Sequence, residues 1–223
     1  MPLRQVIESQ INAALWECCS PAYVRLVNAT GMMGEALEAL MEDAATFATK
    51  DPASMGDPFR IVQTYTSFRA VLHYRIAHAM VCTQAISAEA SCYASLVSSR
   101  GKLLSGAELH PCCHIGKRFV LDHGIGTVFG ETASIGDDCY VLGGVTLGAS
   151  GIAGNPQGKR HPSIGNRVQL GAFARIFGSV SIGDDVFVGS HCVITDDVPA
   201  GSKVTLRSSL QVIKPISKIY LKA

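Results

Sequence analysis

The chain has 223 residues, a formal net charge of +1 and only 17% charged residues. A nearly neutral chain lacks the basic field that attracts nucleic acid. Its low share of charged residues indicates that much surface is buried, within the fold or between subunits. It contains no apolar, uncharged stretch of about 18 residues and begins without an apolar signal core. We therefore expect a cytoplasmic protein without nucleic-acid or membrane partners.

Eight cysteines are spread along the chain without a CxxC pair or the clustered spacing of a zinc site. We therefore expect buried or free thiols in a reducing cytosol, and no metal. A nucleophilic role for Cys112 or Cys113 is a weaker alternative, since their positions beside turns do not suggest an activated thiol.

The first hundred residues predict helices. Ala, Met, Leu and Glu, which favour helix, are frequent there, and only three of the 22 glycines fall in this part. Asp51-Pro52 and Asp57-Pro58 are signals of a turn or of the start of a helix. We assign residues 1–102 to an α-helical domain that supports oligomerisation. The expected helices cover residues 3–18, 21–29, 33–48, 58–82 and 86–99.

An aliphatic or aromatic residue recurs at every sixth position along the second half of the chain. The series runs through Leu103, Leu109, Ile115, Leu121, then Phe129, Ile135, Val141, Leu147, then Ile164, Leu170, Ile176, Ile182, Val188 and Ile194. Because six is neither the helical period of 3.6 nor the strand period of two, the series predicts a parallel β-helix whose core these side chains fill. We expect an α+β protein with this solenoid over residues 103–206 and a tail over 207–223.

The repeat is interrupted twice. The spacing from Leu121 to Phe129 is eight, which places two extra residues in a bulge. The spacing from Leu147 to Ile164 is seventeen, which sends eleven extra residues out as a Gly-rich loop within 149–162. Interruptions of a regular solenoid are usual places for function.

The bulge holds the first group of residues with catalytic potential, Asp122 and His123. An imidazole with an ordinary pKa near 6.5 suits proton removal at neutral pH, so His123 is the expected general base. Glu108 is a candidate to orient its other ring nitrogen. Asp122 and Asp57 can hold an ammonium group.

The loop ends in the second group, Arg160 and His161. The guanidinium of Arg160 can hold a carboxylate through two hydrogen bonds. Together with the carboxylates above, it describes a pocket for a small zwitterion with a nucleophilic side chain.

Each of these residues has a plainer interpretation. A histidine in a repeat protein often lies at a turn or on a solvated edge, and we expect this of His110, His114 and His191. Asp57 before Pro58 is equally typical of a helix cap. The position of Asp122-His123 inside an interruption of the repeat favours function instead.

Four motifs occur in order: Leu121-Asp122-His123-Gly124-Ile125-Gly126, Gly130-Glu131-Thr132-Ala133, Val145-Thr146-Leu147-Gly148 and Arg160-His161-Pro162. In this order they resemble the serine O-acetyltransferase family, and Tyr74-Arg75-Ile76-Ala77-His78 resembles the helix that leads into its repeats. The resemblance implies a left-handed β-helix, an exception to the usual right-handed crossover. It also implies homotrimers with active sites between subunits, often paired as dimers of trimers.

The reaction that the resemblance implies is direct acetyl transfer from acetyl-CoA to the hydroxyl of L-serine, without a metal. His123 resembles the base, Asp122 and Asp57 the ammonium partners, Arg160 the carboxylate clamp and His161 a second contact near the hydroxyl.

The resemblance also implies where CoA binds. Gly148, Ala149 and Ala172 resemble positions whose backbone lines the CoA arm, and a backbone N–H there could stabilise the oxyanion. Lys203 is a candidate contact for the CoA phosphates.

Several features depart from the family pattern. Glu108 stands where the family usually has aspartate, the loop before Arg160 is longer and carries Pro156, and the segment after Asp57 is shorter. The chain ends in Ala223 rather than in the isoleucine with which relatives dock into a sulfhydrylase, so we do not expect that complex.

These departures leave two alternatives open. One is a hexapeptide acetyltransferase for another hydroxy amino acid, a sugar or an antibiotic in a specialised pathway. The other is a scaffold without catalytic activity, which would have no use for Asp122-His123 at the bulge.

Overall fold

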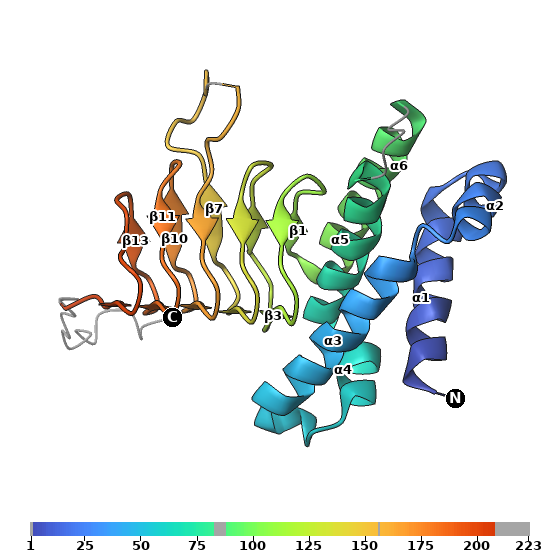
Figure 1. Cartoon of the computed structure of the whole chain (residues 1–223), viewed down its shortest axis with the longest axis horizontal. Helices are drawn as coiled ribbons and strands as arrows, with labels where there is room; N and C mark the ends of the chain where they lie inside the picture. Colours follow the sequence, from blue (N-terminus) through green and yellow to red (C-terminus); the bar gives the residue numbers. More distant parts are fainter. Residues whose placement is uncertain (1, 83–87, 156, 208–223) are drawn as a thin grey trace, which may run out of the picture.

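The computed structural model describes residues 2–82, 88–155 and 157–207. The expectations for Pro156, for residues 86 and 87 and for the tail beyond residue 207 lie outside these ranges. Helices form the first half and a solenoid of short parallel strands the second, as predicted (Figure 1). Within the described ranges, no helix is both long and apolar enough to cross a membrane.

The helices are α1 (Leu3–Cys18), α2 (Pro21–Thr30), α3 (Gly34–Lys50), the 3₁₀ helix η1 (Pro52–Ser54), α4 (Pro58–Thr64), α5 (Thr66–Cys82) and α6 (Ala88–Ser105). α5 and α6 pack against each other and against the first strand of the solenoid (Figure 1). The prediction of one helix over 58–82 is wrong, because Tyr65 has an extended backbone (φ −88°, ψ 114°) that separates α4 from α5.

The expectation that Leu103 points into the solenoid is also wrong. α6 continues to Ser105, and Leu103 lies on this helix with 78% of its surface exposed. The periodic core starts at Leu109 instead.

The strands form three parallel sheets that make the faces of a prism. Sheet A contains β1 (Glu108–Leu109), β4 (Val128–Phe129), β7 (Thr146–Gly148), β10 (Arg175–Phe177) and β13 (Val193–Ile194). Sheet B contains β2 (His114–Ile115), β5 (Ser134–Ile135), β8 (Ser163–Ile164) and β11 (Ser181–Ile182). Sheet C contains β3 (Val120–Leu121), β6 (Tyr140–Val141), β9 (Gln169–Leu170), β12 (Phe187–Val188) and β14 (Lys203–Val204).

Strand register stacks the periodic residues as the spacing predicts. Leu109 pairs with Phe129, and Phe129 with Leu147, along sheet A. Every periodic residue from Leu109 to Ile194 is buried. The apolar core of the left-handed β-helix is therefore a continuous column of these side chains.

The corners of the prism carry the interruptions. We call the corner between a strand of sheet C and the next strand of sheet A the C–A corner. It contains the bulge, residues 122–127, whereas the same corner of the next coil is shorter and contains only residues 142–145. The A–B corner, between a strand of sheet A and the next strand of sheet B, contains the loop of residues 149–162. The same corner of the previous coil contains only residues 130–133. The loop projects from the solenoid after β7 (Figure 1). Both interruptions thus leave the sheets intact and place extra residues at two different edges.

A buried ion pair joins the helices to the first coil. Arg75 of α5 donates from Nε to Oδ2 of Asp43 of α3 at 3.0 Å, and both side chains are buried. Arg75 also donates to the carbonyl oxygens of Ile115 and Gly116, each at 2.6 Å, and Asp43 accepts the N–H of Phe119 at 2.8 Å. These bonds satisfy both charges and fix α3 and α5 on the solenoid.

The B–C corner carries two forked ion pairs between neighbouring coils. Arg118 binds both oxygens of Asp138 at 2.6 and 2.8 Å, and Arg167 binds both oxygens of Asp185 at 2.7 Å. The bond from arginine lowers the pKa of Asp138 and of Asp185. All four residues have positive φ, between 54° and 61°, a conformation that costs non-glycine residues energy.

Candidate active site

His123 stands at the C–A corner with an accessible side chain. The turn gives it a φ of 62°, and 82% of the side chain is exposed. Oδ1 of Asp122 lies 3.9 Å from its Nε2. This carboxylate can stabilise a positive charge on the ring while the ring stays open to a substrate.

A tyrosine of the next coil fixes the carboxylate of Asp122. Only 17% of its side chain is exposed, and Oδ2 accepts a hydrogen bond of 2.9 Å from the hydroxyl of Tyr140 in β6. Burial, followed by this bond, raises the pKa of Tyr140, which keeps the hydroxyl protonated as the donor. One oxygen of Asp122 is therefore fixed, and the other faces His123.

Asp51 forms a second pair of the same kind. Its Oδ2 accepts a hydrogen bond of 2.6 Å from the hydroxyl of Tyr65, which raises the pKa of Tyr65. The charge of Asp122 also acts on Tyr65, and the charge of Asp51 acts on Tyr140. The two carboxylate–tyrosine pairs therefore lie near each other, with the segment after α3 extending to the C–A corner.

Asp51 is a candidate site residue that no sequence motif indicates. The pair Asp51-Pro52 predicts a turn, and Asp51 does cap η1 by accepting the N–H of Ala53 at 2.9 Å. Asp57, which the sequence predicts as an ammonium partner, caps α4 through the N–H of Phe59 at 2.9 Å. Asp57 is therefore placed as a helix cap, whereas Asp51 is the residue whose carboxylate pairs with Tyr65.

Glu108 lies on β1 and is engaged elsewhere. Its Oε2 accepts a hydrogen bond of 2.5 Å from Nζ of Lys102 at the end of α6. Among the residues that the structure describes, no hydrogen bond or ion pair connects it with His123. In this chain, Asp122 is the carboxylate next to that histidine.

Arg160 belongs to the A–B corner. Its guanidinium forms an ion pair with Glu131 of the previous coil, and this bond lowers the pKa of Glu131. A quarter of the Arg160 side chain is exposed. The pair orients the guanidinium and leaves part of it free for an anionic group.

His161 is buried next to Arg160 and has a defined tautomer. Its Nδ1 accepts the backbone N–H of Thr132 at 3.2 Å and lies 2.8 Å from the hydroxyl oxygen of Thr132. That oxygen accepts the backbone N–H groups of Arg160 and His161, so its own proton points to Nδ1. Burial lowers the pKa of His161, which leaves a neutral ring with its proton on Nε2.

The residues proposed for CoA are divided between edges. Ala149 lines an open groove of about 630 Å³ at the base of the loop, together with residues such as Phe177 and Thr195. Gly148 packs on Phe177, where an added Cβ would lie 2.8 Å from the ring. Ala172 lies at the C–A corner and Lys203 on β14, so one chain brings together only Gly148 and Ala149.

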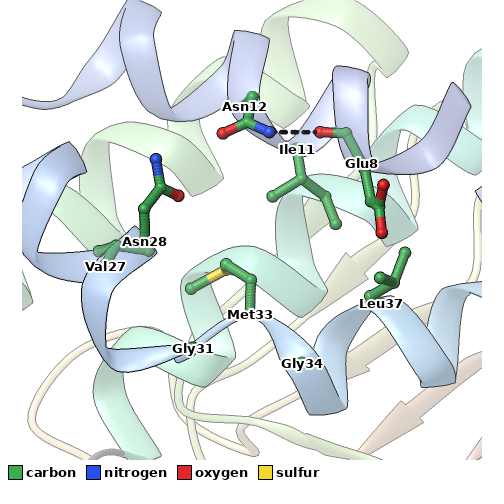
Figure 2. Close-up of a pocket in the computed structure, with 9 residues that line it drawn as sticks. All are labelled: Glu8, Ile11, Asn12, Val27, Asn28, Gly31, Met33, Gly34 and Leu37. Carbon is green, nitrogen blue, oxygen red and sulfur yellow. Dashed lines mark hydrogen bonds between the residues drawn. The ribbon is translucent and has the colours of Figure 1, made fainter. Parts of the chain in front are cut away.

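A further pocket, of about 220 Å³, lies among the helices (Figure 2). It is lined by Glu8, Ile11, Asn12, Val27, Asn28, Gly31, Met33, Gly34 and Leu37. Glu8 is its single titratable side chain, so this pocket offers no acid–base pair and contains none of the expected site residues. The described residues also include no group of three or more His, Cys, Asp or Glu side chains that could hold a metal ion.

Comparisons with known proteins agree with the fold and with the motifs. The model of the bacterial transferase hexapeptide (six repeats) family matches residues 161–196. The chain is 39% identical over 153 residues to the serine acetyltransferase of Helicobacter pylori, covering 69% of this chain and 84% of that relative.

Two solved structures with bound ligands are similar to most of the chain. Soybean serine acetyltransferase complexed with serine has a TM-score of 0.76 and 30% identity, covering 91% of this chain and 81% of that one. Serine acetyltransferase of Brucella abortus strain S19 in complex with coenzyme A has a TM-score of 0.76 and 28% identity, covering 89% and 77%.

Proposed function

This chain belongs to the serine acetyltransferase family, and from that premise we propose that it transfers acetyl from acetyl-CoA to the hydroxyl of L-serine. The products are O-acetyl-L-serine and CoA. The observation that carries the proposal is the exposed His123 beside the fixed carboxylate of Asp122. Relatives of similar fold that bind serine and coenzyme A support this choice of substrates.

His123 acts as the general base. It removes the proton of the serine hydroxyl as the oxygen attacks the carbonyl carbon of the thioester, and the resulting imidazolium faces Oδ1 of Asp122, 3.9 Å away. The tetrahedral intermediate then expels the CoA sulfur, which receives the proton from the imidazolium. A general base of this kind contributes roughly 10²–10⁴-fold to the rate.

Two carboxylates bind the ammonium group. Asp122 and Asp51 are each oriented by a tyrosine hydroxyl, and together they supply a negative region beside the base. Asp57 is the other proposed ammonium partner. Asp51→Asn and Asp57→Asn distinguish the two. Asparagine still caps a helix but has no charge, so KM for L-serine should rise only in the variant that has lost an ammonium partner.

Arg160 and His161 bind the other end of the substrate. The guanidinium of Arg160 takes the substrate carboxylate while Glu131 keeps it oriented. His161, neutral with its proton on Nε2, supplies a hydrogen-bond donor near the reacting hydroxyl.

The two groups of residues combine between subunits of a homotrimer. Asp122 and His123 lie on the C–A corner, whereas Arg160 and His161 lie on the A–B corner of the same chain. In a closed ring, the C–A corner of one subunit faces the A–B corner of the next, so each interface completes one site. The helices at the end of the solenoid pair two such trimers.

Acetyl-CoA lies along the same interface. The backbone at Gly148 and Ala149 lines the groove beside the loop, Ala172 comes from the facing C–A corner, and Lys203 reaches the CoA phosphates. Glu108 can orient His123 only if its carboxylate leaves Lys102 and binds the imidazole. Any such contact would be additional to that of Asp122 with His123.

The direct test is to detect O-acetyl-L-serine by mass spectrometry after incubation with acetyl-CoA and L-serine. We expect the product with the wild-type protein and a loss of 10²–10⁴-fold in kcat with His123→Ala, while CoA binding is preserved. An absence of product from folded wild-type protein would refute the proposed function. Equal loss of turnover and CoA binding in His123→Ala would make the residue structural.

A further inference from the structure

The fold does not require a tyrosine at position 140. It is the outward residue of β6 in sheet C, between Val120 and Gln169 of the neighbouring strands. Further along this face, Gln169, Phe187 and Lys203 occupy equivalent outward positions and are exposed. The solenoid thus accepts a variety of side chains here, and a tyrosine is not needed to close the sheet.

What distinguishes Tyr140 is its contact across the corner. Its hydroxyl reaches Oδ2 of Asp122 in the previous coil at 2.9 Å, while its ring packs against buried hydrophobic residues. The carboxylate of Asp122 cannot rotate without losing this bond. Its other oxygen, Oδ1, is the atom nearest to Nε2 of His123. One hydroxyl therefore determines which way the Asp122 carboxylate faces.

The neighbouring pair repeats this arrangement from the helical part. Tyr65 holds Asp51 at 2.6 Å, and each tyrosine feels the charge of the other pair's carboxylate. Each carboxylate is thus oriented by a tyrosine hydroxyl, and together the two can attract an ammonium group.

We propose that Tyr140 is a positioning residue for the acceptor amino acid, which acts by fixing Asp122 so that its free oxygen binds the ammonium group beside His123. This inference rests on the proposed function, because it concerns the same site. It assigns to Tyr140 a part in recognition of the amino acid and none in binding of acetyl-CoA.

The test is a double-mutant cycle on Tyr140→Phe and Asp122→Asn. Tyr140→Phe keeps the ring and removes the hydroxyl, so we expect KM for L-serine to rise about tenfold to a hundredfold, the range for a hydrogen bond to a charged group. KM for acetyl-CoA and the unfolding midpoint should match those of Tyr93→Phe. Tyr93 is a suitable control because it lies on α6, where its ring packs on Tyr23.

The cycle separates positioning from general damage. If Tyr140 acts through Asp122, the double variant should bind L-serine, measured by calorimetry, no more weakly than Asp122→Asn alone. Additive losses, or an unchanged KM in Tyr140→Phe, would overturn the role of Tyr140 while leaving the proposed function in place. A wild-type protein that neither binds nor acetylates L-serine would refute the proposed function itself.

Discussion

Gly130 provides the space that the imidazole of His161 occupies. A Cβ atom on Gly130 would lie 2.1 Å from both Cδ2 and Nε2 of that ring, which is closer than atoms can approach. The ring cannot move aside without losing its contacts with Thr132, because it is 8% exposed and bonded through Nδ1. A missing side chain in one coil thus fixes a proposed substrate contact in the next.

Gly130→Ala should therefore displace the imidazole of His161. We expect kcat/KM to fall by about 10²-fold, which is the loss expected when a group beside the reacting atoms is displaced. The apolar core is not touched, so circular dichroism should remain that of the wild type. Gly34→Ala is the matched control, since nothing lies within 4 Å of the added Cβ there. Full activity of Gly130→Ala would show that His161 has no part in the reaction.

The division of the site between two corners predicts complementation. His123→Ala and Arg160→Ala should each be inactive alone, but co-expression should restore activity, because about a quarter of the interfaces in mixed rings then combine two intact edges. The measurement is specific activity of the purified mixed oligomer.

His123→Ala co-expressed with Asp122→Asn is the control for this experiment. Both residues lie on the C–A corner, so no interface of that mixture has an intact edge of this kind. No recovery in the test mixture would place the whole site within one subunit. Recovery in the control would show instead that His123 and Asp122 do not act together at one edge.

The ion pair between Asp43 and Arg75 predicts a large stability effect. Removing one partner leaves a charge buried and unpaired, so Arg75→Met should cost about 3–5 kcal/mol. Adding Asp43→Leu should recover much of this loss, because the pair is then replaced by apolar groups. Urea unfolding at one protein concentration measures both, and equal stability of Arg75→Met and wild type would contradict the role of the pair at this junction.

Acid should weaken the B–C corner. Arginine lowers the folded-state pKa of Asp138 and Asp185 below the unfolded value of about 3.9, so their ion pairs stabilise the protein above that pH. This stabilisation is lost as the pH falls through the lowered folded-state pKa. The difference in unfolding midpoint between wild type and Asp138→Asn should accordingly be largest at neutral pH, shrink in acid, and shrink at high salt. A difference that is independent of pH would attribute the effect of Asp138→Asn to packing.

The solenoid could be predicted from the sequence because its core is a local repeat. Each coil buries the same positions, so the period, both interruptions and their lengths are visible without the structure. Leu103 fits the period only by coincidence, since leucines on a helix also recur at short intervals and α6 extends past it. The break at Tyr65 has neither glycine nor proline, so no local signal in the sequence separates α4 from α5.

The candidate site could be predicted only in part, because its contacts cross long distances in sequence. The motifs identified Asp122, His123, Arg160 and His161, which carry their signal in adjacent residues. Asp51 is drawn to this region by a tyrosine bond and by the packing of α3 on the solenoid, neither of which leaves a local pattern. The ion pair of Glu108 with Lys102 likewise depends on how far α6 extends.

Whether L-serine is the acceptor is tested by measuring CoA release from acetyl-CoA with a panel of acceptors: L-serine, D-serine, L-homoserine, L-threonine and an amino sugar. The arrangement of two carboxylates, Arg160 and His123 predicts a kcat/KM for L-serine well above all the others. A clear preference for a different acceptor, above all for the amino sugar without a carboxylate, would contradict the assignment of this site to L-serine.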